Sequence, residues 1–176
     1  MAVRRILQLG DPTLRDVSSA VTDLDKAAVT IADLRDTLHE FQRAHGFGRG
    51  ISAVQIGTLE RLIYLEFEGA PIELVNPEFE YLSPLTFRLW DDCFSFPDLL
   101  VYLERSKTVR LRYLDEHGAS RRLEASGALS ELLQHEMDHL DGILAVDRAI
   151  DRHSLCTRKE FDRRLKREAA VARPMK

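Results

Sequence analysis

The segment that most constrains the fold is residues 127–141, in which ionisable side chains interrupt an otherwise apolar helical pattern. Its large apolar residues recur at steps of three and four, which predicts a helix with a broad apolar face: Leu129, Leu132, Leu133, Met137 and Leu140. Ser126 is a suitable N-cap, and Gly142 is suited to end the helix. Because such a face must be covered, we expect this helix to be central and buried, with the rest of the chain folded around it.

The remaining pattern predicts an α+β fold with antiparallel strands. A helical pattern over residues 24–45 ends at Gly46, and another helix is expected over 153–172, before Pro174. Between them lie short β-rich runs at 61–67, 71–79, 108–115 and 121–125, and Glu116-His117-Gly118 forms the predicted hairpin turn between the last two. The order helix, strands, helix, helix favours antiparallel pairing around the central helix.

Composition indicates one globular domain and excludes several classes of protein. The 176 residues are 44% hydrophobic and 31% charged, which suits a single domain over 1–176. The apolar runs are far shorter than the roughly 20 residues that cross a bilayer, so no membrane contact is expected. The first residues lack the apolar stretch of a secretory signal. Two cysteines, Cys93 and Cys156, cannot form a disulfide framework, which favours reduced thiols and a cytoplasmic location.

Charge is unevenly distributed along the chain. The net charge of −4 argues against a dedicated nucleic-acid binder. Residues 151–176 nevertheless carry nine Lys or Arg against four Asp or Glu, which predicts a basic C-terminal helix or arm. Two interpretations stay open at this point, a solvated helix face and a contact with RNA or an acidic partner.

The sequence Gln134-His135-Glu136-Met137-Asp138-His139 carries the strongest chemical signal. Two histidines four residues apart on a helix share one face, about 6 Å apart along its axis, and can share one metal ion. Glu136 stands beside them as a base for a bound water. The alternative is a chance pattern on an amphipathic helix. That alternative is weakened because buried imidazoles and a buried carboxylate are costly unless they are paired or bind a metal.

A catalytic metal site of this kind needs a third protein ligand, and two residues compete for the role. Glu160 lies 21 residues after His139, a spacing that resembles gluzincin-type peptidases. Its basic neighbours favour a solvated, salt-bridged side chain instead. Cys93 lies 42 residues before His135 in a mostly apolar stretch that ends at Pro97. Taken alone, it is equally interpretable as a thiolate ligand or as a small core residue.

Three separated segments resemble the peptide deformylase family, in the family's order. They are Gly48-Arg49-Gly50-Ile51-Ser52-Ala53-Val54-Gln55, Asp91-Asp92-Cys93-Phe94-Ser95, and Gln134 to His139 followed by Leu140-Asp141-Gly142. The opening run from Ile6 to Arg15 and the run Val75-Asn76-Pro77-Glu78 are also similar. A lone HExxH motif would be weak, but three ordered segments with a cysteine in the second are specific.

The resemblance implies a fold, a cofactor and a mechanism. Strands would wrap the HExxH helix, and one divalent ion would be held by Cys93, His135 and His139. Fe(II) is the expected ion, with Zn, Ni or Co as alternatives. Glu136 would be the general base, while the Gln55 side chain and the Phe94 backbone N–H would stabilise the oxyanion. Gly48 and Gly50 would let the backbone approach the substrate closely.

The activity implied is removal of the N-formyl group from the formyl-methionine of newly made polypeptides. The substrate would be an N-formylated peptide, and the basic C-terminal helix would be a possible contact with the ribosome. Two other functions stay open: a catalytically weakened paralogue that binds formylated chains or the ribosome, and a gluzincin-type peptidase that uses Glu160. Intact Glu136 argues against the paralogue, since a pure binder has no need of the base.

Several residues depart from the family's pattern near the implied substrate pocket. Arg49 and Glu131 replace apolar residues there, and Asp92 replaces a glycine that meets the peptide. One hypothesis is that Arg49 and Glu131 pair across a smaller or more polar pocket, and the alternative is that both point to solvent. We also predict an ion pair between Asp138 and Arg105.

Overall fold

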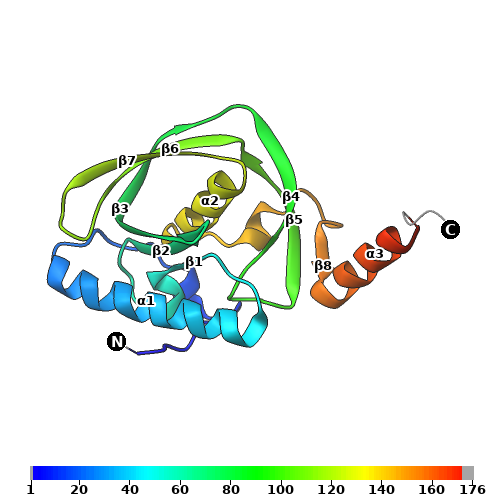
Figure 1. Cartoon of the computed structure of the whole chain (residues 1–176), viewed down its shortest axis with the longest axis horizontal. Coiled ribbons are helices and arrows are strands. Elements are labelled where there is room, and N and C mark those ends of the chain that lie inside the picture. Colours follow the sequence, from blue (N-terminus) through cyan, green and yellow to red (C-terminus); the bar gives the residue numbers. More distant parts are fainter. Residues whose placement is uncertain (1, 172–176) are drawn as a thin grey trace.

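The structure, a computed structural model, describes residues 2–171 and contains three helices and two antiparallel sheets in that range (Figure 1). The five-stranded sheet has the order β1-β2-β3-β6-β7, with bounds Gly50–Ser52, Leu62–Phe67, Ala70–Leu82, Thr108–Leu114 and Ser120–Ser126. The three-stranded sheet has the order β4-β5-β8, with bounds Thr86–Asp92, Leu99–Ser106 and Leu155–Thr157. This arrangement confirms the predicted α+β class with antiparallel strands.

Helix α2 (Ala128–Leu140) lies at the centre, between the curved five-stranded sheet and strands β4 and β5 (Figure 1). Every residue from Ser130 to Leu140 is buried. The apolar side chains of α2 pack on those of β2, β3, β6 and β7 in one cluster. The helix is therefore covered on all sides, as its broad apolar face predicts. Its N-cap is Gly127, with φ +59°, so the prediction of Ser126 as N-cap was wrong by one position.

Helix α1 (Leu24–His45) covers the outer face of β1 and β2, and its bounds match the predicted helix. The Asp23 side chain accepts a hydrogen bond from the Lys26 N–H at the N-terminus. Gly46, in the left-handed region at φ +76°, ends the helix by donating its N–H to Gln42. Local signals at both ends thus fix the length of α1.

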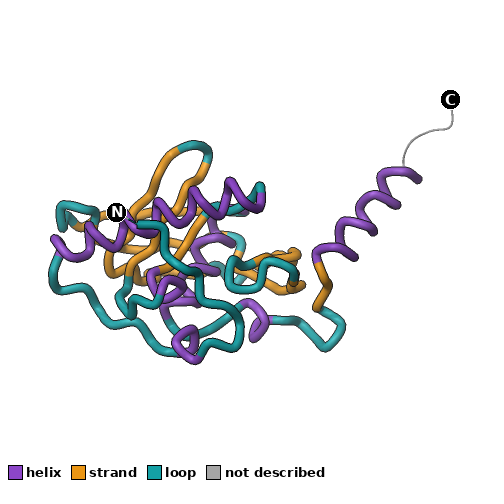
Figure 2. Tube along the Cα trace, turned by 90° about the horizontal axis from the view of Figure 1, so that it is seen from below, coloured by secondary structure: helices purple, strands orange, loops and turns teal. Residues whose placement is uncertain are grey.

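Helix α3 (Arg158–Val171) begins five residues later than the sequence predicts. Residues 155–157 pair with β5 as β8, and their burial alternates, with Cys156 buried and its two neighbours exposed. The backbone hydrogen bonds of that short strand hold these residues extended and delay the helix. Beyond it α3 extends away from the rest of the molecule (Figure 2). The predicted end of the helix at 172 falls outside the described residues.

Strands β4 and β5 form a hairpin that the sequence analysis did not predict. Their register runs from Thr86 opposite Ser106 to Asp92 opposite Leu100. This hairpin closes the side of α2 that the five-stranded sheet leaves open (Figure 1), and Cys93 is the first residue of the connection between its two strands. None of the helices in residues 2–171 is both long enough and apolar enough to cross a bilayer.

Candidate metal centre and active site

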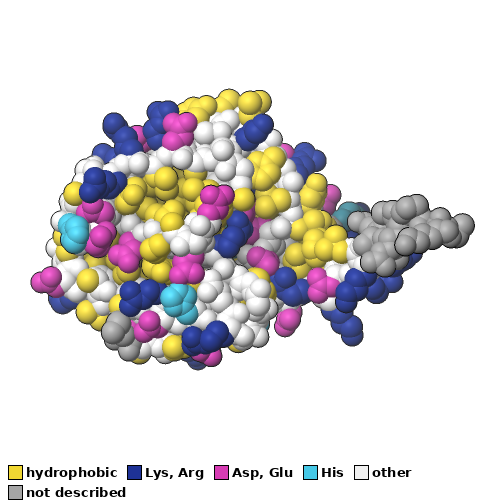
Figure 3. Space-filling view, in the orientation of Figure 1, with side chains coloured by type: hydrophobic (Ala, Val, Ile, Leu, Met, Phe, Trp, Pro, Cys, Tyr) yellow, Lys and Arg dark blue, Asp and Glu magenta, His cyan; other side chains and the backbone are white. Residues whose placement is uncertain are grey.

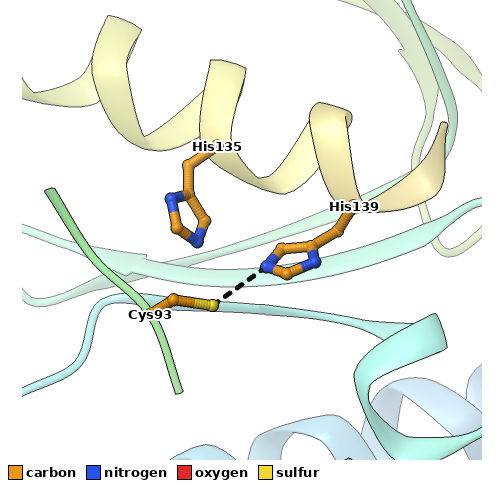
Figure 4. Close-up of side chains that lie close together, drawn as sticks. All are labelled: Cys93, His135 and His139. Atoms are coloured by element: carbon orange, nitrogen blue, oxygen red, sulfur yellow. Dashed lines mark hydrogen bonds between the residues drawn. The ribbon is translucent and has the colours of Figure 1, made fainter. Parts of the chain in front are cut away.

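Cys93, His135 and His139 converge in the interior, beside the central helix (Figure 4). The two histidines lie one turn apart on α2, and Cys93 follows β4. Cys93 Sγ is 3.2 Å from His139 Nε2, and one donor atom from each of the three residues lies within 4.8 Å of the others. All three side chains are buried. The structure therefore brings together the three residues that the resemblance implies as metal ligands.

The geometry of this cluster fits one tetrahedral metal ion. Bonds of about 2.3 Å to sulfur and about 2.1 Å to nitrogen place two such ligands about 3.6 Å apart, close to the separation of Cys93 and His139. One thiolate and two imidazoles suit Zn, Fe, Co or Ni. Burial lowers the pKa of His139 well below its ordinary value, and His135 beside it acts in the same direction. The shift favours the neutral imidazole of His139, which is the form that binds a metal.

Asp91 orients the His135 ring. Its Oδ2 lies 3.0 Å from His135 Nδ1, so the other ring nitrogen is turned toward the cluster. Burial works against the charge on Asp91, but His135 and Arg105 beside it hold the pKa of the carboxyl below its ordinary value. Arg105 is itself buried between Asp91 and Asp138, at 3.3 Å and 2.5 Å. The predicted pair of Asp138 with Arg105 is confirmed. Arg105 in turn contacts Asp91, which holds the His135 ring.

Glu136 and Gln55 are fixed beside the cluster by one residue, Ser52, at the end of β1. The Ser52 hydroxyl lies 2.5 Å from Glu136 Oε2, and the Ser52 backbone N–H donates to Gln55 Oε1 at 2.9 Å. The Gln55 amide nitrogen therefore faces Cys93 Sγ, at 3.7 Å. Burial raises the pKa of Glu136 above its ordinary value. The sequence analysis assigned no role to Ser52, because a serine in a short strand carries no chemical signal of its own.

A cavity of about 390 Å³ opens beside the cluster. It is lined by Cys93 and His135 together with the residues that the resemblance implies for catalysis or substrate binding, Gly48, Arg49, Gly50, Gln55, Asp92, Phe94, Glu131 and Glu136. His139 belongs to the cluster but not to this lining. Segments far apart in the sequence thus form one site.

Two glycines of the lining are required by close packing. Gly48 has φ +129°, and a Cβ there would lie 2.5 Å from the Phe94 ring. A Cβ on Gly50 would lie 2.5 Å from Leu65 and 2.9 Å from Glu136 Oε1. Any larger residue at either position would displace a wall of the cavity or the carboxylate of Glu136.

Arg49 and Glu131 pair across one wall of the cavity, at 2.7 Å. The Glu131 side chain is only 3% exposed, whereas that of Arg49 is 42% exposed. Arg49 also donates to the backbone oxygen of Ala128. Burial and the Asp91 carboxylate raise the pKa of Glu131, while Arg49 opposes them. The predicted pairing is confirmed, and the alternative in which both residues point to solvent is wrong.

Arg158, the first residue of α3, contacts two of the residues that line the cavity. Its guanidinium bonds Asp92 at 2.6 Å and the Pro97 backbone oxygen at 2.7 Å, and it lies 4.1 Å from the centre of the Phe47 ring. Asp92 and Phe47 both line the cavity. The sequence analysis missed this residue, because nothing in its local sequence distinguishes it from the other basic residues of the C-terminal segment.

Glu160 does not contribute to the metal centre. It lies on α3, where it pairs with Arg163 and Arg164. Neither of the two potential metal-binding clusters among residues 2–171 contains it. The structure thus selects Cys93 over Glu160 as the third ligand, and the gluzincin-like interpretation was wrong.

Comparison with known proteins agrees with this geometry. A family model described as Polypeptide deformylase matches residues 3–154. The chain belongs to the peptide deformylase family. It is 36% identical over 155 residues to the peptide deformylase of Bartonella tribocorum, which covers 84% of each chain. It is 35% identical over 158 residues to that of Thermotoga neapolitana, which covers 89% of this chain and 93% of that one.

Solved peptide deformylases share the fold. The crystal structure of the Thermotoga maritima peptide deformylase superposes with a TM-score of 0.80 at 31% identity, covering 86% of this chain and 100% of that one. The Synechococcus elongatus peptide deformylase in complex with actinonin superposes with a TM-score of 0.78 at 32% identity, covering 97% of this chain and 90% of that one. This family member is thus a metallohydrolase with a Cys-His-His metal site.

Proposed function

We propose that this chain hydrolyses the formamide bond at the N-terminus of formylated peptides, releasing formate and a free amine. The observation that carries the proposal is the Cys93, His135 and His139 cluster, which borders a cavity that also holds Glu136 and Gln55. When bound there, a divalent metal ion would lower the pKa of a water molecule and polarise the formyl carbonyl. All other groups that the reaction needs are side-chain or backbone groups of this chain.

Glu136 is proposed to carry the proton. It would take one from the attacking water and deliver it to the amine nitrogen as the carbon–nitrogen bond breaks. The hydroxyl of Ser52 engages Oε2, while Oε1 lies on the side of Gly50, one of the residues that line the cavity. Burial raises the pKa of the carboxyl, which makes it a stronger base toward the attacking water.

Gln55 and the Phe94 backbone N–H are proposed to stabilise negative charge on the formyl oxygen. Ser52 holds the Gln55 carbonyl oxygen, so the amide N–H groups face the cluster before substrate arrives. Donors that are already oriented need no rearrangement in the transition state, and removal of one such donor typically lowers the rate by about 10²–10³-fold.

The finer features of the substrate and cofactor are proposals as well. Fe(II) is the expected metal ion, although the donor set suits Zn, Ni or Co equally. The resemblance by itself implies formyl-methionine at the start of newly made polypeptides as the substrate, together with a cytoplasmic location, whereas Arg49 and Glu131 bear on which first side chain this chain accepts. Gly48, Gly50 and Asp92 would meet the peptide backbone. The basic residues of α3 support a contact with the ribosome, because Arg163, Arg164, Lys166 and Arg167 are exposed. Figure 3 shows Lys and Arg side chains gathered at the visible part of this projecting segment.

A catalytically weakened paralogue that only binds formylated chains is the less favoured function. A protein of that kind would have no use for a buried carboxylate beside the cluster. Here Glu136 is retained, buried and oriented by Ser52.

The test is formate release by anaerobically purified protein whose metal content has been measured. The substrates are formylated tripeptides that begin with methionine, norleucine, serine or asparagine. The variant Glu136→Gln should keep its metal and lose activity by about 10²–10⁴-fold, because it cannot accept the proton. Glu124→Gln, an exposed position on β7, is the control. Activity retained in Glu136→Gln would exclude Glu136 as the base, and no formate from any peptide would refute the proposed hydrolase.

A further inference from the structure

The wall of the cavity nearest the metal ligands carries a charged pair rather than an apolar surface. Glu131 lies one helical turn before His135 on the same face of α2, and one of its carboxylate oxygens is within 4.8 Å of a His135 ring nitrogen. Arg49, immediately before β1, closes the pair at 2.7 Å. The pair thus forms part of the surface that surrounds a molecule reacting at the cluster.

The closeness of the Arg49–Glu131 pair to His135 makes the first side chain of a formylated peptide the part of the substrate that the pair can contact. In a formylated peptide the first Cα is two bonds from the formyl carbon, so the first side chain begins within about 4 Å of the reacting atom. Arg49 and Glu131 line the same cavity as Cys93 and His135, and Glu131 lies within 4.8 Å of a His135 ring nitrogen, so the pair is within reach of that side chain when the formyl group lies at the cluster.

The pair cannot withdraw easily to make room for a long apolar group. The Glu131 carboxylate is buried, and Arg49 is its ion-pair partner. Separating the two would leave a buried carboxylate without its counter-charge. Arg49 also donates to the Ala128 backbone oxygen, which fixes the guanidinium over the start of α2. A substrate side chain therefore meets a fixed, polar surface.

The exposed edge of Arg49 determines which side chain fits that surface. A long apolar side chain laid over it would remove water from N–H donors and offer no acceptor in return. A short neutral side chain with a hydrogen-bond acceptor would replace the water. An acidic side chain would meet Glu131 and Asp92, and a basic one would compete with Arg49 for Glu131.

We infer that the Arg49–Glu131 pair selects formylated substrates whose first side chain is short, neutral and able to accept a hydrogen bond, in preference to methionine. The inference rests on the proposed hydrolysis of formylated peptides and names the substrate class of that same site. Serine and asparagine represent the favoured class, and methionine and norleucine represent the disfavoured one.

The decisive experiment compares kcat/KM for the four formylated tripeptides, which differ only in the first residue. The unmodified protein should favour the serine and asparagine peptides by about tenfold, the effect of one buried donor that is left without a partner. The double variant Arg49→Leu/Glu131→Leu should reverse this order, because it replaces the pair with an apolar wall. The double variant Arg112→Leu/Glu78→Leu removes an exposed pair far from the cavity and should leave the order unchanged.

Each outcome decides a separate question. Preference of the unmodified protein for methionine, or equal rates for all four peptides, overturns the inference while leaving the proposed hydrolase intact. Absence of formate from every peptide refutes the hydrolase and the inference with it. If the Leu/Leu variant does not fold, the unmodified protein still decides by its own order of preference. Binding of the same peptides to metal-loaded Glu136→Gln, measured by calorimetry, should follow that order without turnover.

Discussion

Three reactive side chains of this site, those of His135, Glu136 and Gln55, are each held by a second residue. Asp91 orients His135, and Ser52 orients both Glu136 and Gln55. These partners are buried, so the contacts are not weakened by competition with water. A site that must bind a metal and hold donors at fixed positions benefits from such support, because the groups need not rearrange during the reaction.

At the residue scale, replacement of Cys93 separates the ligand role from a packing role. Cys93→Ala removes the sulfur that faces His139, so we expect metal content to fall from about one ion per chain to less than about a tenth after dialysis against a weak chelator. The matched control is Cys156→Ala, because Cys156 is also buried but belongs to no cluster. Equal metal contents in the two variants, measured by elemental analysis, would contradict the assignment of Cys93 as a ligand.

At the element scale, the accuracy of the sequence-based prediction followed the strength of local patterns. Helix α1, strands β2, β3, β6 and β7, and the turn at Glu116-His117-Gly118 were predicted close to their observed bounds. The β4–β5 hairpin was missed because its buried positions include Asp91 and Arg105, whose charges hide the alternation. Those charges are buried only because α2 supplies their partners, which no local pattern could show.

The Asp115 carboxylate stabilises the turn of the β6–β7 hairpin, and this stabilisation depends on pH. Asp115 accepts hydrogen bonds from the His117 and Ala119 backbone N–H groups and from Arg121, and Arg121 lowers the pKa of the carboxyl. Since the folded pKa is depressed, the stabilisation is present above the ordinary aspartate pKa and is lost as the pH falls through the lowered value. Asp115→Asn should lower the Tm by about 2–4 °C at pH 7.

The difference in Tm between the unmodified protein and Asp115→Asn should shrink as the pH falls below about 4, near the ordinary aspartate pKa. Thermal unfolding followed by circular dichroism at several pH values measures it. Glu116→Gln, in the same turn, serves as the control for a generic change of charge. A Tm difference that is constant from pH 7 to pH 3 would show that the carboxylate charge is not responsible.

The start of α3 is expected to influence substrate binding through Arg158. Arg158→Ala removes the partner of Asp92 and the cation that lies over Phe47, both at the rim of the cavity. We expect KM to rise by about three- to tenfold with little change in kcat, since the metal ligands and Glu136 are untouched. Arg163→Ala, one turn further along and paired with Glu160, is the control. An unchanged KM would show that the rim holds its shape without Arg158.

At the scale of the whole molecule, the chain consists of a layered body and a basic helix that leaves it (Figure 2). Phe161 contacts Trp90 at the base of α3, but the side chains from 162 to 167 are exposed. Ending the chain after Phe161 should therefore change the Tm by less than about 2 °C, because residues 162–167 bury little surface against the body. A larger decrease in thermal unfolding would show that the outer part of α3 stabilises the body.

The sequence by itself determined the elements whose signals are local: the helical periods, the glycine that ends α1 and the hairpin turn. It also identified the metal ligands on α2, because a four-residue spacing on a helix places two side chains on one face. The family resemblance indicated Cys93 as the third ligand, and the tertiary structure excluded Glu160 and chose between the two orientations considered for Arg49 and Glu131. The contact of Ser52 with Glu136 was visible only in the tertiary structure. Those contacts join segments up to 84 residues apart, and their geometry depends on how the two sheets enclose α2.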